Sequence, residues 1–275
     1  MNQRISMDKL HEVYYSRFKM LHDFLVEHNI KYYAIGGTVL GAIRHKAIIP
    51  WDPDMDIAMD RNEYNKFLKV LDELDPKFLK AINFENTKYI EHALTKVCLV
   101  GTLNESAITS KKFNKNFHID VFPLDTVYLD EKKQTRLVKK AKRLNHWLYL
   151  KSRAVTYPNP LLNIVLVFTK ILLLPFSYHY LAKKVDSLVR KPSMSKDNNP
   201  NILWTSSGVY SFKKESHLTS TYGEPTLHPI GNIEVYLPEK THQFLVDTYG
   251  EDYMTPYDRS GGEVLKCVLT DEYVR

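Results

Sequence analysis

The 275-residue chain is 44% hydrophobic and 12% aromatic, and 38 Lys and Arg residues against 32 Asp and Glu residues give a net charge of +6. This composition excludes a chain that is disordered as a whole, and the length predicts one large domain or one domain with a helical extension. Two cysteines, Cys98 and Cys267, indicate no disulfide framework, cannot form a zinc site alone, and favour a reduced cytoplasmic setting.

The first predicted elements are a helix and a strand. Residues 1–18 carry charges throughout and lack an apolar core of signal-peptide length, so we expect a protein that is not secreted. The apolar, aromatic run at residues 32–35 predicts a strand. Apolar residues at helical spacing predict an amphipathic helix over residues 6–29 that packs on the sheet: Leu10, Val13, Tyr14, Phe18, Leu21, Phe24 and Leu25.

A glycine pair, Gly36 and Gly37, follows this strand and leads into a helical pattern over residues 38–44. Backbone N–H groups at the start of a helix, together with the positive end of its dipole, suit a phosphate group. Arg44 and the two residues after it add cationic donors. A glycine pair alone is usually only a turn, but in this context it predicts a phosphate site.

Two aspartates follow on the next predicted strand. Alternation with period two puts Asp54 and Asp56 on one face, and Met55 and Ile57 on the other. Neighbouring carboxylates repel each other unless a cation lies between them. One or two carboxylates plus substrate phosphates form the usual shell of Mg²⁺. Residues 31–60 therefore predict a site for a metal-bound di- or triphosphate.

Two elements connect this strand to the next acidic one. Asp60 and Glu63 resemble a capping box at the start of a helix that ends before Pro76. Residues 88–102 predict one or two strands, in which we expect Lys96 to face the nucleotide. A lone lysine is more often a solvated surface residue, so that alternative stays open.

A third strand, at residues 117–121, carries Asp120. Its apolar residues share one face, and His118 and Asp120 share the other. If this strand lies beside the Asp54 strand, Asp120 completes a trio of carboxylates. His118 would then border the site, although a partly exposed strand histidine is the commoner role.

Residues 131–153 stand apart because nine Lys and Arg residues accompany one acid, Glu131, for a net charge of +8. A charge run of this kind is usually a solvated helix face. No DNA- or RNA-binding motif accompanies it, so we expect no nucleic-acid partner. The apolar face of this predicted helix consists of Leu137, Ala141, Leu144 and Leu148.

Residues 161–174 are almost entirely apolar and are interrupted by Asn163 and Lys170, which lie seven residues apart on the same side of a helix. The segment is shorter than the ~20 apolar residues that span a bilayer. A buried core helix, an interfacial helix and a poor transmembrane span are the alternatives, and we favour an interfacial or partly buried helix. The adjacent basic helix would contact anionic lipid.

The remaining elements carry less chemistry. Residues 191–201 predict a loop, residues 233–237 predict a strand, and Pro238 is expected at the first position of a helix that ends at Gly250. A small polar and aromatic cluster of undetermined use comprises Trp204, Ser206, Ser207, Gly208 and Tyr210.

Three segments resemble the LicD family of polymerase-β-like nucleotidyltransferases: GGTVLGAIRHKAIIPWDPDMDI at 36–57, IDVFPLD at 119–125 and YGEDYMTP at 249–256. The resemblance thus spans residues 31–256 in patches, and none of these motifs lies between 130 and 225. The chain departs from the family at Pro53, where many relatives have aspartate, and at Asn116, where many have glycine. His118 replaces a residue that is usually apolar.

The resemblance implies an α/β fold with a small mixed sheet of the nucleotidyltransferase type, flanked by helices and carrying a helical insertion. The expected organisation is a catalytic core at residues 1–130, a basic and apolar insertion at 131–200 that docks on a membrane, and a C-terminal part at 201–275 that packs back on the core.

The family is associated with moving phosphocholine from CDP-choline onto cell-surface glycans. It implies a metal-dependent phosphotransferase that uses CDP-choline or another CDP-alcohol. The acceptor would be a lipid-linked precursor of teichoic acid or lipopolysaccharide, at the inner face of the plasma membrane. Asp54, Asp56 and Asp120 would be the catalytic residues and would bind one or two Mg²⁺, or Mn²⁺, and Asp120 could accept the proton of the acceptor hydroxyl.

Two other functions stay open: a nucleotidyltransferase that attaches a nucleoside monophosphate to a small hydroxyl acceptor, and a non-catalytic membrane-associated subunit of glycan assembly. Trp51, Trp204 and Tyr210 are candidates for an aromatic cage around the quaternary ammonium of choline. The residues expected to bind nucleotide or phosphate are Gly36, Gly37, Thr38, Arg44, His45, Lys46, Trp51 and Lys96.

Overall fold

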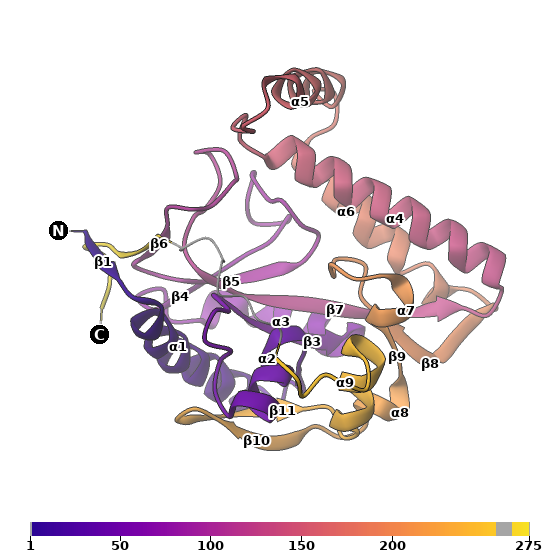
Figure 1. Ribbon diagram of the computed structural model, residues 1–275. Coiled ribbons are helices and arrows are strands. Elements are labelled where there is room, and N and C mark those ends of the chain that lie inside the picture. Colours follow the sequence, from indigo (N-terminus) through magenta and orange to yellow (C-terminus); the bar gives the residue numbers. More distant parts are fainter. Residues whose placement is uncertain (1, 257–265, 275) are drawn as a thin grey trace.

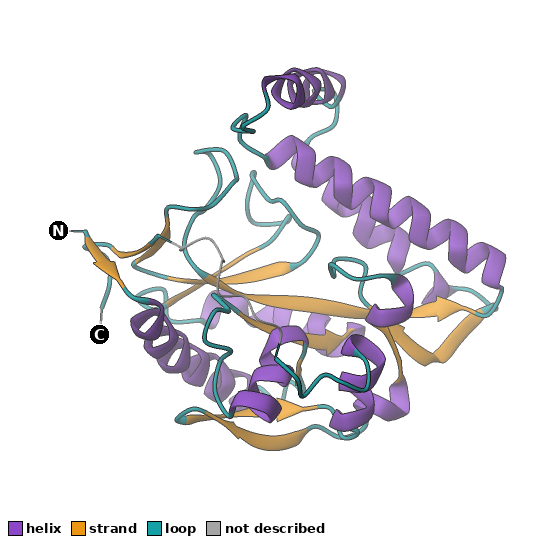
Figure 2. Cartoon of the chain, in the orientation of Figure 1, coloured by secondary structure: helices purple, strands orange, loops and turns teal. Residues whose placement is uncertain are grey.

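The computed structural model describes residues 2–256 and 266–274, and its centre is a mixed sheet of seven strands (Figures 1 and 2). β3 and β7 run parallel, and the other paired strands of this sheet run antiparallel. The α/β class predicted from the sequence is confirmed, while its nucleotidyltransferase type stays a prediction. The order is β2 (Tyr33–Ala34), β3 (Met55–Asp60), β7 (His118–Tyr128), β5 (Thr95–Leu99) and β4 (Leu79–Ile82), with β8 (Asn198–Trp204) paired to β7 and β9 (Ser216–Leu218) paired to β8.

The predicted N-terminal helix is confirmed as α1 (Met7–Glu27). It begins where the Ser6 hydroxyl accepts a hydrogen bond from the Lys9 N–H at 3.2 Å, an N-cap contact. Of the apolar residues predicted to face the core, all are buried except Phe24, which is half-buried. The Tyr14 hydroxyl donates to the His118 carbonyl at 3.0 Å, which fixes α1 against the start of β7.

Two smaller sheets flank the main one. β1 (Gln3–Ile5), β12 (Cys267–Leu269) and β6 (Thr102–Asn104) form an antiparallel sheet that brings segments near both chain ends together. β10 (Thr226–Ile230) and β11 (Ile233–Leu237) form a hairpin beside α1, and β11 confirms the strand predicted there.

The segment after the glycine pair folds as α2 (Gly36–Leu40) and continues as a π-helical turn, η1 (Gly41–His45). The helix after β3 is α3 (Arg61–Val70), followed by the short η2 (Leu71–Glu73). The Asp60 carboxylate accepts from two N–H groups of the first turn of α3, as the capping prediction requires. Glu63 instead accepts from the Lys31 N–H, so only half of the predicted capping box forms.

β7 is longer than predicted and runs through Pro123. β5 pairs with its first residues and β8 with its last ones. Pro123 lies between these two stretches, where β7 pairs with β3 on one side and with neither β5 nor β8 on the other. A proline, which has no N–H to donate, therefore interrupts no hydrogen bond on the side without a partner strand.

The insertion consists of α4 (Glu131–Ser152), α5 (Pro160–Leu172), α6 (Tyr178–Val189) and the short η3 (Pro192–Met194). The apolar face predicted for α4 is buried and packs with α6. Figure 1 shows α5 beyond the end of α4, away from the sheet. Leu166 is its one buried side chain, so the buried-core alternative for residues 161–174 is wrong.

After β8, the chain crosses the sheet edge through α7 (Phe212–Glu215), β9, α8 (Thr219–Tyr222) and α9 (Thr241–Tyr249). The expectation that a helix begins at Pro238 is wrong. The N–H groups of Glu239 and Lys240 bond to carbonyls of α8, so helical geometry begins only at Thr241. Gly250 ends α9 with a φ of 102°, as predicted for a C-terminal glycine.

A buried ion-pair network ties the insertion to the sheet. The Arg61 guanidinium of α3 donates to both oxygens of Asp125 on β7, at 2.8 and 2.5 Å, and to Asp186 of α6 at 2.8 Å. The three side chains are only 14%, 5% and 14% exposed. Removing one partner of an ion pair that is buried this deeply strongly destabilises the fold, because the charges that remain stay buried without a partner.

Replacing Arg61 should therefore destabilise the fold strongly. We expect Arg61→Ala to lower the free energy of unfolding by about 3–5 kcal/mol, since Asp125 and Asp186 would remain buried without their partner. The control is Lys19→Ala, which breaks an exposed pair with Asp23 and should cost no more than about 1 kcal/mol. Urea titration measures both, and equal losses would contradict the structural role of this network.

Candidate active site

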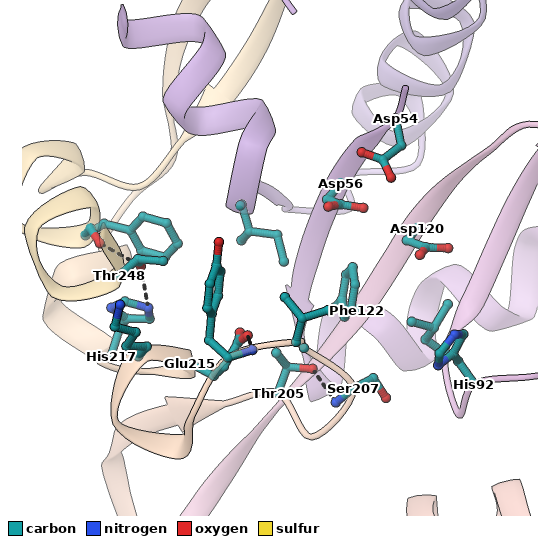
Figure 3. Close-up of a pocket in the computed structure, with 18 of the residues that line it drawn as sticks. Asp54, Asp56, His92, Asp120, Phe122, Thr205, Ser207, Glu215, His217 and Thr248 are labelled. Carbon is teal, nitrogen blue, oxygen red and sulfur yellow. Dashed lines mark hydrogen bonds between the residues drawn. The ribbon is translucent and has the colours of Figure 1, made fainter. Parts of the chain in front are cut away.

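The register of the central strands brings the predicted acidic residues together. In the parallel pair of β3 and β7, Asp56 lies opposite Asp120. In the antiparallel pair of β7 and β5, Asp120 lies opposite Lys96. Asp54 immediately precedes β3 and also faces this row (Figure 3). The strands of Asp54 and Asp120 are thus adjacent, as the carboxylate trio requires.

At Asp54 and Asp56, the charge of Lys96 does not outweigh burial and the neighbouring carboxylates. The protein around them removes water, and the negative charges of Asp52, Asp120 and each other add to that effect. Together these causes raise the pKa of both carboxyls well above the usual range. Such an arrangement stores repulsion that a bound cation would relieve.

Asp120 differs from the other two because Lys96 lies beside it. Lys96 Nζ is 2.7 Å from Glu91 Oε1 and 3.9 Å from Asp120 Oδ1. Burial alone would raise the pKa of Asp120, but its basic neighbours, above all the charged Lys96, outweigh burial and lower the pKa below its usual range. Asp120 is therefore the ionised member of the trio, and its Oδ1 is buried without a hydrogen-bond partner.

The hydrogen bonds of His118 define its tautomer. Lys96 Nζ lies 2.9 Å from His118 Nε2, and an ammonium group only donates, so Nε2 accepts. Nδ1 then donates to the Asn116 carbonyl at 3.1 Å. Burial, and after it the charge of Lys96, lowers the pKa of His118, so this imidazole is neutral and supports Lys96.

Two cavities meet at the carboxylates. The larger, about 330 Å³, is lined by the glycine pair, Arg44, Trp51 and Tyr253. The smaller, about 200 Å³, extends from the carboxylates toward α7 and α9. Figure 3 shows the three aspartates on one side of the smaller cavity and Glu215 and His217 on the other. The residues that line both cavities are Gly36, Asp54, Asp56, Val209 and Tyr210.

Glycine is needed at both positions because the carboxylates of Asp52 and Asp56 lie close to the backbone there. Gly36 has a φ of 58°, in the left-handed region, and a Cβ there would lie 3.4 Å from Asp56 Oδ2. A Cβ on Gly37 would lie 2.2 Å from Asp52 Oδ2. The Thr38 hydroxyl accepts from the Asp56 N–H at 2.7 Å. Thr38 thus fixes the acidic strand with the hydroxyl that was expected to bind phosphate.

The other residues predicted to contact the nucleotide fall into two groups. Arg44 and Trp51 line the larger cavity, and Arg44 donates to the Tyr253 carbonyl at 2.9 Å. His45, Lys46 and Lys96 line neither of the two cavities. His45 contacts the edge of the Trp51 ring, so it supports a lining residue. Contact of these three with a nucleotide stays a prediction to which the geometry adds no support.

Several lining residues were not predicted from the sequence. The smaller cavity has aromatic walls from Phe122, Tyr210, Tyr222 and Phe244, with Glu215 among them. Of these, only Tyr210 belonged to the cluster noted in the sequence. Trp204, proposed for an aromatic cage, is instead buried against Phe212 and lines neither cavity.

Glu215 is held in place by the loop before it. Its Oε1 accepts from the Tyr210 N–H at 2.8 Å, and a Cβ on Gly208 would lie 2.3 Å from its carboxyl group. Burial raises its pKa. The small serine and glycine residues of the cluster noted in the sequence allow this close packing, but they do not indicate which side chain packs there.

The carboxylates fit a divalent cation by their chemistry. Asp54 and Asp56 repel each other, and Asp120 has an unpartnered buried oxygen. Among residues 2–256 and 266–274, no three His, Cys, Asp or Glu side chains are placed so that they could hold a metal ion by themselves. An ion held here would therefore take further ligands from substrate, as Mg²⁺ commonly does with phosphates.

Comparison with known proteins gives the family. Residues 29–160 match the family model described as "LicD/FKTN/FKRP, nucleotidyltransferase domain". Over 49 residues the chain is 49% identical to the lipopolysaccharide cholinephosphotransferase LicD of Haemophilus influenzae, which is 18% of each protein. Residues 29–160 are therefore a LicD-family domain. The matched range contains all three aspartates of the site.

Two other relatives come from rickettsiae. An uncharacterized protein of Rickettsia typhi is 34% identical over 119 residues, which is 42% of this chain and 36% of the relative. One of Rickettsia prowazekii is 38% identical over 61 residues, 22% of this chain and 23% of the relative. The alignments thus span about a fifth to a third of these relatives. The LicD match supports a transferase, and the finer activity is a proposal.

The charge of this LicD-family site should appear in the pH dependence of stability. With EDTA present to remove metal ions, the pKa of Asp56 in the folded protein lies above the value of about 3.9 expected in the unfolded chain. At pH values between these two pKa values, the native state binds more protons than the unfolded state. This contribution to the free energy of unfolding should decrease as pH rises from about 4. We expect the free energy of unfolding of Asp56→Asn to fall less steeply with rising pH than that of the wild type.

Urea titrations at about pH 4.5 and pH 7.5 measure this effect. The matched control is Asp72→Asn, which changes an exposed carboxylate outside the site and should keep the wild-type slope. A wild-type slope in Asp56→Asn would show that this carboxylate carries no strain.

Proposed function

We propose that this protein is a metal-dependent transferase that moves phosphocholine, or a similar phospho-alcohol, from CDP-choline or another CDP-alcohol to a hydroxyl of a glycan precursor. The observation that carries the proposal is the smaller cavity, whose aromatic walls and single carboxylate open directly onto the aspartate row. The name of the Haemophilus influenzae relative supports the choice of phosphocholine and of a lipopolysaccharide-type acceptor.

The smaller cavity suits a quaternary ammonium group. Such a cation cannot donate hydrogen bonds, and it is bound by aromatic faces and by charge. Phe122, Tyr222 and Phe244 supply apolar and aromatic surface, and Glu215 supplies the charge. Burial makes the ionised form of Glu215 costly and raises its pKa, although the Tyr210 N–H and Lys142 act in the opposite direction. Binding of choline would favour the ionised form.

The larger cavity suits the nucleotide half of the donor. Trp51 offers a ring for stacking, and Arg44 lies beside the glycine pair that begins α2. The donor would then place its pyrophosphate where the two cavities meet, at Asp54 and Asp56. This placement puts the phosphorus that is attacked beside Asp120.

In the proposed reaction, the acceptor hydroxyl oxygen attacks the phosphorus that carries choline. A new P–O bond forms to the acceptor, the P–O bond to the CMP phosphate breaks, and CMP leaves. Asp120 accepts the hydroxyl proton, and Lys96 keeps its carboxylate ionised for that role. Asp54, Asp56 and Asp120 would hold Mg²⁺ or Mn²⁺, which would offset the charge of the phosphates.

The products test this function. With CDP-choline, a purified lipid-linked or oligosaccharide acceptor and Mg²⁺, we expect metal-dependent release of CMP and an acceptor whose mass increases by phosphocholine. Asp120→Asn should lower the rate about 100- to 10,000-fold through loss of the base. Asp56→Ala should leave no measurable turnover, and Asp72→Asn should retain the wild-type rate.

Mass spectrometry of the acceptor decides between the proposed reaction and its main rival. An acceptor that gains a nucleoside monophosphate would show a nucleotidyltransferase instead. A wild-type rate in Asp56→Ala would contradict the assignment of the aspartates.

A further inference from the structure

The polarity of α5 is reversed relative to an ordinary surface helix. Its narrow inner stripe, which faces the rest of the protein, contains Asn163, Leu166, Lys170 and Leu173. The remaining surface is almost wholly apolar and exposed, with Phe168 64% and Leu172 75% exposed. A soluble helix normally turns its polar residues to water and its apolar ones to the core.

Hydrogen bonds of the polar residues fix this orientation. The Asn163 side chain donates to the Tyr157 carbonyl and accepts from the Tyr157 N–H, both at 2.9 Å. Lys170 donates to the Arg153 carbonyl at 2.5 Å, and Lys151 donates to the Leu173 carbonyl at 2.9 Å. Because the polar groups are used inward, the apolar side chains point outward.

The exposed apolar surface is concentrated in this segment of the described chain. It extends from the start of α5 into the turn that follows it. Exposed apolar patches of this kind mark sites of protein or membrane binding. The residues that form it are Leu161, Leu162, Ile164, Val165, Val167, Phe168, Ile171, Leu172, Leu174 and Phe176.

The charge around this patch has one sign. Residues 132–185 contain twelve Lys and Arg residues and no Asp or Glu. α4, whose C-terminal end leads toward α5, exposes several of these cations along its length, among them Lys139, Lys140 and Arg143. An apolar patch next to an unbalanced basic surface is complementary to a bilayer with anionic headgroups.

We propose that α5 lies in the headgroup region of an anionic bilayer, with α4 contributing the contacts to lipid phosphates. At 13 residues, α5 is about 20 Å long, shorter than the hydrocarbon core of about 30 Å. No helix of the described residues is long and apolar enough to cross a membrane. A second copy of the chain fits this patch less well, because it would bring a second set of cations against the first.

Vesicle flotation with the full chain tests this surface. At low salt, we expect the wild type to float with mixed phosphatidylcholine and phosphatidylglycerol vesicles, and not with phosphatidylcholine alone. Rising salt should release it, because screening weakens the contacts between lysines and headgroups. Phe168→Glu combined with Leu172→Glu should lower the bound fraction at least tenfold, since both side chains are exposed and the fold does not need them.

The matched control is Leu218→Glu combined with Leu227→Glu, which changes exposed leucines far from α5 and should bind like the wild type. Unchanged thermal unfolding of the α5 variant excludes misfolding as the cause. The proposal is overturned if the wild type does not float with anionic vesicles, or if the α5 variant floats equally well. A dimer in solution that the α5 substitutions dissociate, without vesicle binding, would identify a second copy as the occupant and also overturn it.

Discussion

The candidate site depends on one strand pairing. Parallel pairing of β3 with β7 sets Asp56 directly opposite Asp120, and Asp54 extends the row. Like charges on adjacent strands are unfavourable, and in this row the surrounding residues offset the negative charge of Asp120 but not that of Asp56. Lys96 on β5 lowers the pKa of Asp120, whereas at Asp56 burial and the neighbouring carboxylates outweigh the same lysine and raise the pKa. The unbalanced side is the one that opens to both cavities.

The helical insertion contributes to the site as well as to the exposed surface of α5. Lys142 of α4 donates to the Tyr210 carbonyl at 2.9 Å, and Asn145 donates to the Ser206 carbonyl at 2.8 Å. Both bonds hold the loop that separates the two cavities. The network of Arg61, Asp125 and Asp186 then fixes α6 to the sheet. One insertion thereby supports the cavity wall and carries α5.

Local patterns in the sequence predicted the elements that depend on local chemistry. Alternation placed Asp54, Asp56 and Asp120, because the period of a strand determines which side chains share a face. The same patterns could not reveal Glu215, which reaches the site only because β8 returns to pair with β7. Periodicity also could not tell which side of residues 161–174 faces water, since that depends on hydrogen bonds of Asn163 and Lys170 to distant carbonyls.

The central claim is that the smaller cavity recognises choline through its aromatic walls and Glu215. Titration calorimetry with Mg²⁺, and with no acceptor present, tests this claim most directly. It compares the affinities for CDP-choline and CDP-glycerol in the wild type, in Glu215→Gln and in Glu224→Gln, a control at an exposed position. We predict that the wild type and the control bind CDP-choline at least about tenfold more tightly, a difference of about 1.4 kcal/mol, and that Glu215→Gln loses most of this preference. Equal affinity for the two donors in the wild type, or an unchanged preference in Glu215→Gln, would contradict the account.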